Sequence, residues 1–300
     1  MRTRVVVGPL LVLVATGCTA SRAAERPPGV VAAVSTLNVW GSLLVELGGS
    51  HVDARSLLAN PATDPHDYEA TPADARAIAD AQLVVENGIG YDGWAARVLD
   101  AEPDAQRRVL DVGRLTGVAA GGNPHRWYDP RDVDRVADAI TADLVRLDPA
   151  DAAYFARRRA LLGATGLARY HALIAQIRST YAGTPIGASE SIVAPLADAL
   201  GLRLLTPARF LRAISEGSDP SAADQARIDR QIRDREIAVY VVNRQNSTPD
   251  VAGQVAAARA HGIPIVEVTE TLTPAGATFV DWQVTQLEAL RAALREATGR

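Results

Sequence analysis

The chain has 300 residues, 31 of them basic and 35 acidic, and a formal net charge of −4. Every basic residue is arginine and acids outnumber them, which argues against a nucleic-acid-binding protein. Hydrophobic residues make up 48% of the chain and charged residues 22%, a composition that excludes a disordered protein and allows one large domain or two medium ones.

The N-terminal segment predicts where the protein is located. A short basic start precedes the apolar stretch Val5–Val14, which is too short to span a bilayer and is typical of a signal peptide. The only cysteine, Cys18, follows directly and completes a sequence that resembles a bacterial lipobox, in which the cysteine is lipidated. We therefore expect a signal peptide over 1–17, a lipidated cysteine with a flexible tether over 18–29, and an extracytoplasmic protein anchored to the outer face of the cell membrane.

From Val30 onward, short apolar runs alternate with segments of helical periodicity such as 131–147. The predicted strands are Val30–Leu37, Val52–Leu58, Gln82–Glu86, Arg108–Val112, Pro185–Ala188, Arg203–Leu205, Ile237–Val242 and Ile263–Val268. Strands that alternate with helices indicate an α/β fold with parallel sheets covered by helices on both faces.

The stretch 150–182 interrupts this alternation, since it is rich in Ala, Leu and Arg and has no strand signal. We interpret it as one long helix, weakened and kinked by Gly163 and Gly166, that joins an N-terminal lobe over 30–149 to a C-terminal lobe over 183–300. The alternative is two ordinary helices within a single domain.

Two of the five histidines are presented in a distinctive way. His66 and His125 each follow a proline in a loop, and each loop leads into a strong helix start, Thr71-Pro72-Ala73-Asp74 or Asp129-Pro130-Arg131-Asp132. Such flanks hold an imidazole in a fixed place, which suits a metal ligand or a catalytic base. The other three are expected to be structural or at the surface: His51, His171 and His261.

Two acids complete a candidate site. Glu190 and Glu270 follow the predicted strands Pro185–Ala188 and Ile263–Val268, and ligands of α/β sheets bind beyond the carboxyl ends of the strands. Two imidazoles and two carboxylates form a reasonable ligand set for Mn²⁺, Fe²⁺ or Zn²⁺. Because these ligands bind metal in their deprotonated forms, affinity is expected to fall as the pH drops through the range in which histidine is protonated.

The chain resembles the zinc- and manganese-type substrate-binding proteins of ABC importers, the TroA-like superfamily. The segments that carry the resemblance are Asp64-Pro65-His66-Asp67-Tyr68-Glu69, Val85-Glu86-Asn87-Gly88-Ile89-Gly90 with Trp94, Asn123-Pro124-His125-Arg126-Trp127-Tyr128-Asp129-Pro130, Ser189-Glu190 with Leu196-Ala197 and Gly201-Leu202, and Ile263-Pro264-Ile265 with Thr269-Glu270. The likeness runs from about residue 30 to the C-terminus.

The resemblance implies two α/β lobes, a long connecting helix and a metal held in the cleft between the lobes by His66, His125, Glu190 and Glu270. It further implies a non-enzymatic, monomeric protein that captures Mn²⁺ or Zn²⁺, less readily Fe²⁺, and delivers it to an ABC permease and its ATPase. Arg126, Trp127 and Asp129 are candidates for supporting the ligands.

Three departures from the family pattern bear on which metal is bound. No histidine-rich loop separates the two histidine motifs, Arg126 places a positive charge beside a proposed ligand, and Asn243-Arg244 stands where many relatives have an acid. Two glutamates supply hard oxygen ligands and favour Mn²⁺, yet Zn²⁺ tolerates the same set and usually binds more tightly.

Two other functions compete with this prediction. Gly88-Ile89-Gly90-Tyr91-Asp92-Gly93 fits a dinucleotide-binding pattern, with Asp111 as the ribose-binding acid, but Asp92 puts a negative charge where the pyrophosphate would lie. A secreted metal-dependent hydrolase built on His66 and His125 is the enzyme alternative. Catalytic zinc usually has three protein ligands and an open position, whereas four converging ligands favour binding.

Overall fold

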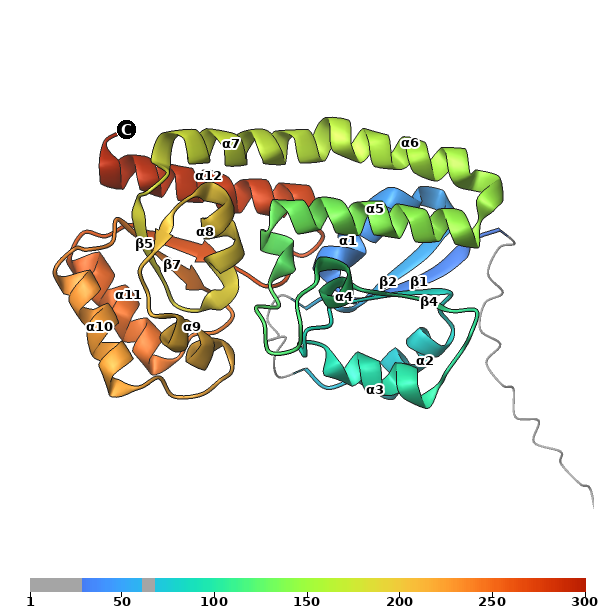
Figure 1. Cartoon of the computed structure of the whole chain (residues 1–300), viewed down its shortest axis with the longest axis horizontal. Coiled ribbons are helices and arrows are strands. Elements are labelled where there is room, and N and C mark those ends of the chain that lie inside the picture. Colours follow the sequence, from blue (N-terminus) through green and yellow to red (C-terminus); the bar gives the residue numbers. More distant parts are fainter. Residues whose placement is uncertain (1–28, 61–67) are drawn as a thin grey trace, which may run out of the picture.

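The computed structural model describes residues 29–60 and 68–300, and these form two α/β lobes that lie side by side beneath a pair of long helices (Figure 1). The predicted signal peptide, the predicted lipidation site Cys18 and the candidate ligand His66 lie outside the described residues. Within the described ranges, no helix combines the length and the apolar character needed to cross a membrane.

The N-terminal lobe contains a parallel sheet with the strand order β2-β1-β3-β4. Every residue of the central strand β1 is buried, as expected for a strand covered on both faces. The strands are β1 (Val31–Leu37), β2 (Val52–Leu58), β3 (Leu83–Glu86) and β4 (Arg108–Asp111). The helices are α1 (Asn38–Gly48), α2 (Pro72–Ala79), α3 (Gly93–Ala101), α4 (Val112–Thr116) and α5 (Pro130–Leu147).

Helices α1 and α5 cover one face of this sheet, and α2 and α3 cover the other (Figure 1). On the first face, Leu43 of α1 and Val133 of α5 belong to the main hydrophobic core. On the second, Ile78 of α2 and Trp94 of α3 pack with Val84 of β3 in a smaller cluster. The lobe is therefore a three-layer sandwich, as the alternation of strands and helices predicts.

The C-terminal lobe repeats this arrangement with the strand order β6-β5-β7-β8, again all parallel. Its outer face packs Phe210, Ile228 and Tyr240 in a separate cluster beneath α9, α10 and α11. The strands are β5 (Pro185–Ala188), β6 (Arg203–Leu204), β7 (Val239–Asn243) and β8 (Ile265–Val268). The helices are α8 (Ala194–Leu200), α9 (Ala208–Ser215), α10 (Ala222–Arg233), α11 (Pro249–Ala260) and α12 (Phe279–Thr298).

A helical connection joins the lobes. It runs through α6 (Ala152–Leu162), a π-helical turn η5 (Gly163–Leu167) and α7 (Ala168–Tyr181) (Figure 1). The irregular turn falls on the two glycines predicted to weaken the helix. At Gly166 a Cβ atom would lie 2.8 Å from a methyl group of Val280, so glycine here lets α12 approach closely.

Helix α12 makes a second tie between the lobes. It lies beside α7 in Figure 1 and also packs on β8 and α1. Its first residue, Phe279, donates its backbone N–H to Ser42 Oγ of α1 at 2.8 Å. The two lobes are thus linked both by α6–α7 and by the start of α12.

The α/β class with two lobes is confirmed, and all eight predicted strands are present. The largest difference is β7, predicted over 237–242 and observed over Val239–Asn243, because its pairing with β5 begins at Val239. Thr71 caps α2 in a capping box with Asp74, and Asp129 caps α5, as the sequence predicts. The predicted domain boundaries stay a prediction.

Candidate metal centre

Three of the four predicted ligands come together between the lobes. His125, Glu190 and Glu270 each have at most 1% of their surface exposed. Each offers one ligand atom within 4.8 Å of the others, and His125 Nε2 lies 3.5 Å from Glu270 Oε2. The fourth predicted ligand, His66, belongs to the segment 61–67, outside the described residues.

His125 is held in place by Asn123. The Asn123 side chain donates through Nδ2 to the Ser191 carbonyl at 2.7 Å, so its Oδ1 is the atom that accepts the His125 backbone N–H at 3.0 Å. The same Oδ1 lies 2.9 Å from His125 Nδ1. An amide oxygen is an acceptor, so Nδ1 carries the proton and Nε2 presents its lone pair. This tautomer leaves Nε2 as the atom that can bind a metal. The hydrogen bond from Asn123 to the Ser191 carbonyl also links the two lobes.

The carboxylates are positioned by neighbouring strand ends. Glu190 follows β5 and Glu270 follows β8, and β7 lies between these strands in the sheet. Asn243, the last residue of β7, donates its amide to Glu190 Oε1 at 2.6 Å and to Glu270 Oε1 at 2.7 Å. Asn246 Nδ2 donates to Glu190 Oε2 at 3.0 Å, and the Tyr91 hydroxyl donates to Glu270 Oε2.

These contacts define the chemistry of the centre. Two buried carboxylates are close together, and the amide and hydroxyl donors to them are uncharged. Burying two negative charges is costly unless a cation balances them. An imidazole nitrogen with two carboxylates is a ligand set for divalent transition metals, so the residues present fit such an ion.

The three predicted supporting residues surround His125 in different ways. The Trp127 ring is fully buried and meets the His125 ring edge-on, with centroids 5.3 Å apart. Arg126 forms ion pairs with Asp129, at 3.0 Å, and with Asp132, so its positive charge is balanced next to the candidate ligand. Burial acts to raise the pKa of Asp129, but hydrogen bonds and charges from Arg131, together with the charge of Arg126, outweigh it and lower this pKa.

The glycine-rich loop after β3 is occupied by the chain's own acid. The buried Asp92 carboxylate accepts the backbone N–H groups of Asn87 and Gly88 at 2.7 and 2.8 Å. It also accepts the Thr36 hydroxyl at 2.6 Å. Asp92 thus takes the amides that a phosphate would need, which weighs against the dinucleotide alternative.

The other three described histidines each contact an acid or a backbone carbonyl. His171 Nε2 lies 2.9 Å from Asp134, and His261 Nδ1 lies 2.8 Å from the carbonyl of Ala257. His51 Nδ1 lies 2.8 Å from Asp151, and with Asp148 these two form a second group with ligand atoms within 4.8 Å. The His51 and Asp151 side chains are 30% and 39% exposed, unlike those of the metal centre.

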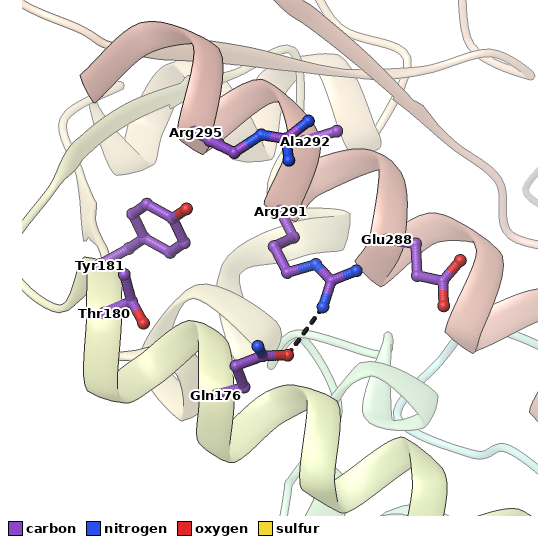
Figure 2. Close-up of a pocket in the computed structure, with 7 residues that line it drawn as sticks. All are labelled: Gln176, Thr180, Tyr181, Glu288, Arg291, Ala292 and Arg295. Carbon is purple, nitrogen blue, oxygen red and sulfur yellow. Dashed lines mark hydrogen bonds between the residues drawn. The ribbon is translucent and has the colours of Figure 1, made fainter. Parts of the chain in front are cut away.

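One hollow lies beside the candidate metal centre and another lies between two long helices. One, of about 240 Å³, opens between the lobes beside Asn123 and Ser191, next to the metal centre. The other, of about 380 Å³, lies between α7 and α12 and has the polar lining drawn in Figure 2, where Arg291 donates to Gln176 at 2.7 Å. This second hollow shares no residue with the metal centre.

Sequence reasoning missed the roles of Tyr91, Asn123 and Asn246, and it noted Asn243 only as a departure from the family pattern. Asn123 stood inside the second histidine motif, two residues before its ligand. For Asn243, the position at a strand end was the available signal, because that edge of the sheet faces the site. Tyr91 and Asn246 lie in loops, and no pattern of the sequence marks their contacts.

Two α/β lobes with a buried group of one histidine and two carboxylates between them fit the class of two-lobed substrate-binding proteins, and the ligand atoms suit a divalent metal. The sequence profile described as "ZnuA: Zinc-uptake complex component A periplasmic" matches residues 33–293. The chain therefore belongs to this family.

Named relatives agree with this assignment. The manganese-binding lipoprotein MntA of Halalkalibacterium halodurans is 28% identical over 146 residues, which are 47% of this chain and 48% of that protein. The iron-binding protein YfeA of Yersinia pestis is 26% identical over 133 residues, 41% of this chain and 42% of that one. The chain thus spans about half the length of the curated relatives it matches.

A solved structure supports the fold. The periplasmic zinc-binding protein TroA of Treponema pallidum superposes with a TM-score of 0.74 and 20% identity, covering 89% of this chain and 99% of that chain. At this level of identity, the similarity shows that the two proteins share the two-lobed architecture.

Proposed function

We propose that the chain captures a divalent transition metal outside the cytoplasmic membrane and delivers it to an ABC permease for import. The observation that carries the proposal is the convergence of His125, Glu190 and Glu270 in a buried centre between the lobes. His66 is the proposed fourth ligand, which would complete a set of two imidazoles and two carboxylates.

Membership of the family supports the delivery step. Relatives are named for metal binding and as lipoproteins of metal ABC transporters, and their names give manganese or iron as the metal. By analogy, the partner of this chain is an ABC permease with its ATPase, and the anchor is a lipid on Cys18. We further propose that the protein acts as a monomer on the outer face of the membrane.

The donor set also supports binding over catalysis. Four protein ligands would leave no open position for the water that a zinc hydrolase activates. The names of the relatives describe binding proteins, so the hydrolase alternative has no specific observation in its favour.

The test is the metal content of the full chain, purified in a mild detergent. The protein is stripped with a chelator, exposed to equal amounts of Mn²⁺ and Zn²⁺, dialysed and analysed by elemental mass spectrometry. About one metal ion per chain is expected, with loss of the ion in His125→Ala and retention in His171→Ala. A wild-type chain that retains no metal would overturn the proposal.

A further inference from the structure

A second group of metal-ligating side chains lies on the N-terminal lobe. It consists of His51, Asp148 and Asp151, each of which offers one ligand atom within 4.8 Å of the others. All three belong to the described part of the chain, and none of them contributes to the candidate metal centre. The group can therefore be judged on its own geometry.

Two short 3₁₀ turns present these side chains. Asp148 and Asp151 bound the turn η4 (Pro149–Asp151), which joins α5 to α6, and the Asp151 backbone N–H donates to the Asp148 carbonyl at 3.3 Å. Residues three apart in such a turn lie above one another, which favours both carboxylates on the same side. His51 ends the other turn, η1 (Gly49–His51), directly before β2.

The His51 ring is already held beside the acids. Its Nδ1 lies 2.8 Å from Asp151 Oδ2. The ring packs on Tyr154 of α6, with centroids 4.2 Å apart, and meets the Phe155 ring edge-on at 6.1 Å. The Tyr154 hydroxyl in turn accepts the backbone N–H of Ser50 at 3.3 Å. These contacts fix the position of the imidazole before any ion binds.

Asp148 supplies an independent sign of a cation. Its Oδ2 is buried and has no hydrogen-bond partner among the described residues. In the same part of the chain neither Asp148 nor Asp151 forms an ion pair with an arginine, whereas Asp143 of α5 pairs with both Arg108 and Arg146. A buried carboxylate oxygen without a donor is costly, and a bound cation would offset this cost.

We propose that His51, Asp148 and Asp151 form an accessory site for a divalent transition metal such as Zn²⁺. The imidazole nitrogen selects a transition metal over Ca²⁺ and Mg²⁺, which prefer oxygen ligands. Two ligand atoms bound at about 2.1 Å lie roughly 3 Å apart on one ion, close to the 2.8 Å between His51 Nδ1 and Asp151 Oδ2. The ion takes the place of the proton between these two atoms, which is released to solvent.

The accessory site differs from the candidate metal centre in its exposure. The His51 and Asp151 side chains are 30% and 39% exposed, so water can complete the coordination of the ion. We expect weaker binding than at the buried centre, and dialysis should release the ion. The inference does not rest on the proposed function, because the two sites share no residue.

The test is isothermal titration of the chelator-stripped full chain with Zn²⁺. The wild type is expected to bind two ions, one strongly and one more weakly, and excess Mg²⁺ should displace neither. Asp148→Asn keeps the shape of the side chain but removes its charge. It should weaken the second ion by at least about tenfold, since losing a ligand costs no less than losing a residue that orients one.

Modification of histidines by diethyl pyrocarbonate, mapped by mass spectrometry, locates the second ion. Zn²⁺ should protect His51 in the wild type but not in Asp148→Asn. His261, a partly buried histidine that contacts the Ala257 carbonyl, is the internal control and should react equally with and without Zn²⁺. Asp104→Asn, at an exposed acid of the same lobe, should bind both ions as the wild type does.

Circular dichroism verifies the fold of each variant. His51→Phe, which retains an aromatic ring beside Tyr154, replaces Asp148→Asn if the latter does not fold. A wild type that binds only the stronger ion, or an Asp148→Asn variant that keeps the second ion and the protection of His51, would overturn the accessory site and leave metal capture intact. A single weak ion that is lost in Asp148→Asn would support the accessory site and overturn the proposed function.

Discussion

The two lobes share one strand order but supply different side chains to the candidate metal centre. The N-terminal lobe offers His125 from a loop that Asn123 holds, whereas the C-terminal lobe offers Glu190 and Glu270 from strand ends. Glu190 and Glu270 each lie two residues beyond the end of a strand, within hydrogen-bonding distance of Asn243 at the end of β7. The comparison teaches that two lobes of the same strand order can present candidate ligands of different charge from different places, a long loop in one lobe and strand ends in the other.

The last residue of the third strand in each sheet also differs in chemistry between the lobes. β3 ends at Glu86 and β7 ends at Asn243. Glu86 is 8% exposed; burial, together with the nearby carboxylates of Asp92 and Asp111, raises its pKa to about 7. The N-terminal lobe therefore keeps a carboxyl group that ionises near neutral pH, and the C-terminal lobe has an amide that donates to two acids.

The largest expected effect on metal affinity comes from changing a carboxylate ligand of the C-terminal lobe. Glu270→Gln should lower metal affinity by more than about 100-fold, because it removes a charged ligand and not merely a supporting residue. Isothermal titration with Zn²⁺ measures the change. Glu267→Gln, at an exposed position of β8, should bind as the wild type does. Equal losses in the two variants would refute the assignment of Glu270.

Metal affinity should also depend on the contacts through which Asn123 holds His125. Asn123→Ala frees the His125 ring and removes the contact with Ser191, so metal affinity is expected to fall about 10- to 100-fold. The same titration applies, with Gln106→Ala as an exposed amide control in the N-terminal lobe. Unchanged affinity in Asn123→Ala would show that the ring needs no such support.

Glu86, the buried acid at the end of β3, predicts that the stability of the chain depends on pH. The pKa of Glu86 is raised in the folded state, so its contribution to the free energy of unfolding declines as the pH rises from about 4.5 to about 7. Glu86→Gln should therefore stabilise the metal-free chain by about 2 kcal/mol at pH 8 and by much less at pH 5. Urea unfolding at both pH values measures this. An identical difference at pH 5 and pH 8 would contradict it.

The smallest effect concerns movement between the lobes. Because α6–α7 and the start of α12 both join them, saturating metal should change the radius of gyration by less than about 1 Å. Small-angle scattering with and without Zn²⁺ tests this. A large compaction would show that the lobes hinge freely.

The sequence predicted the fold well because its signals are local. Alternating apolar runs located the strands, and the capping residues Thr71 and Asp129 located two helix starts. The glycines at 163 and 166 marked the irregular turn of the connecting helix. Each of these features depends on neighbouring residues, which a single sequence displays directly.

The sequence predicted the candidate ligands of the site but not the residues that support them. The supporting contacts join residues that are far apart in the sequence. Tyr91 and Glu270 are 179 positions apart, and Asn243 and Glu190 are 53 apart. The first pair joins the two lobes and the second joins neighbouring strand ends of one sheet, and no periodicity of the sequence reports either kind of contact. The same holds for Asp92, whose bonds to the glycine loop appear only once the loop is folded.

The most direct test of the central claim is the anomalous diffraction of crystals loaded with Zn²⁺ and measured at the zinc edge. The account predicts one strong peak between the lobes, about 2.0–2.2 Å from His125 Nε2 and from one oxygen each of Glu190 and Glu270. A peak at another place, such as the partly exposed group around His51, with none between the lobes, would contradict it.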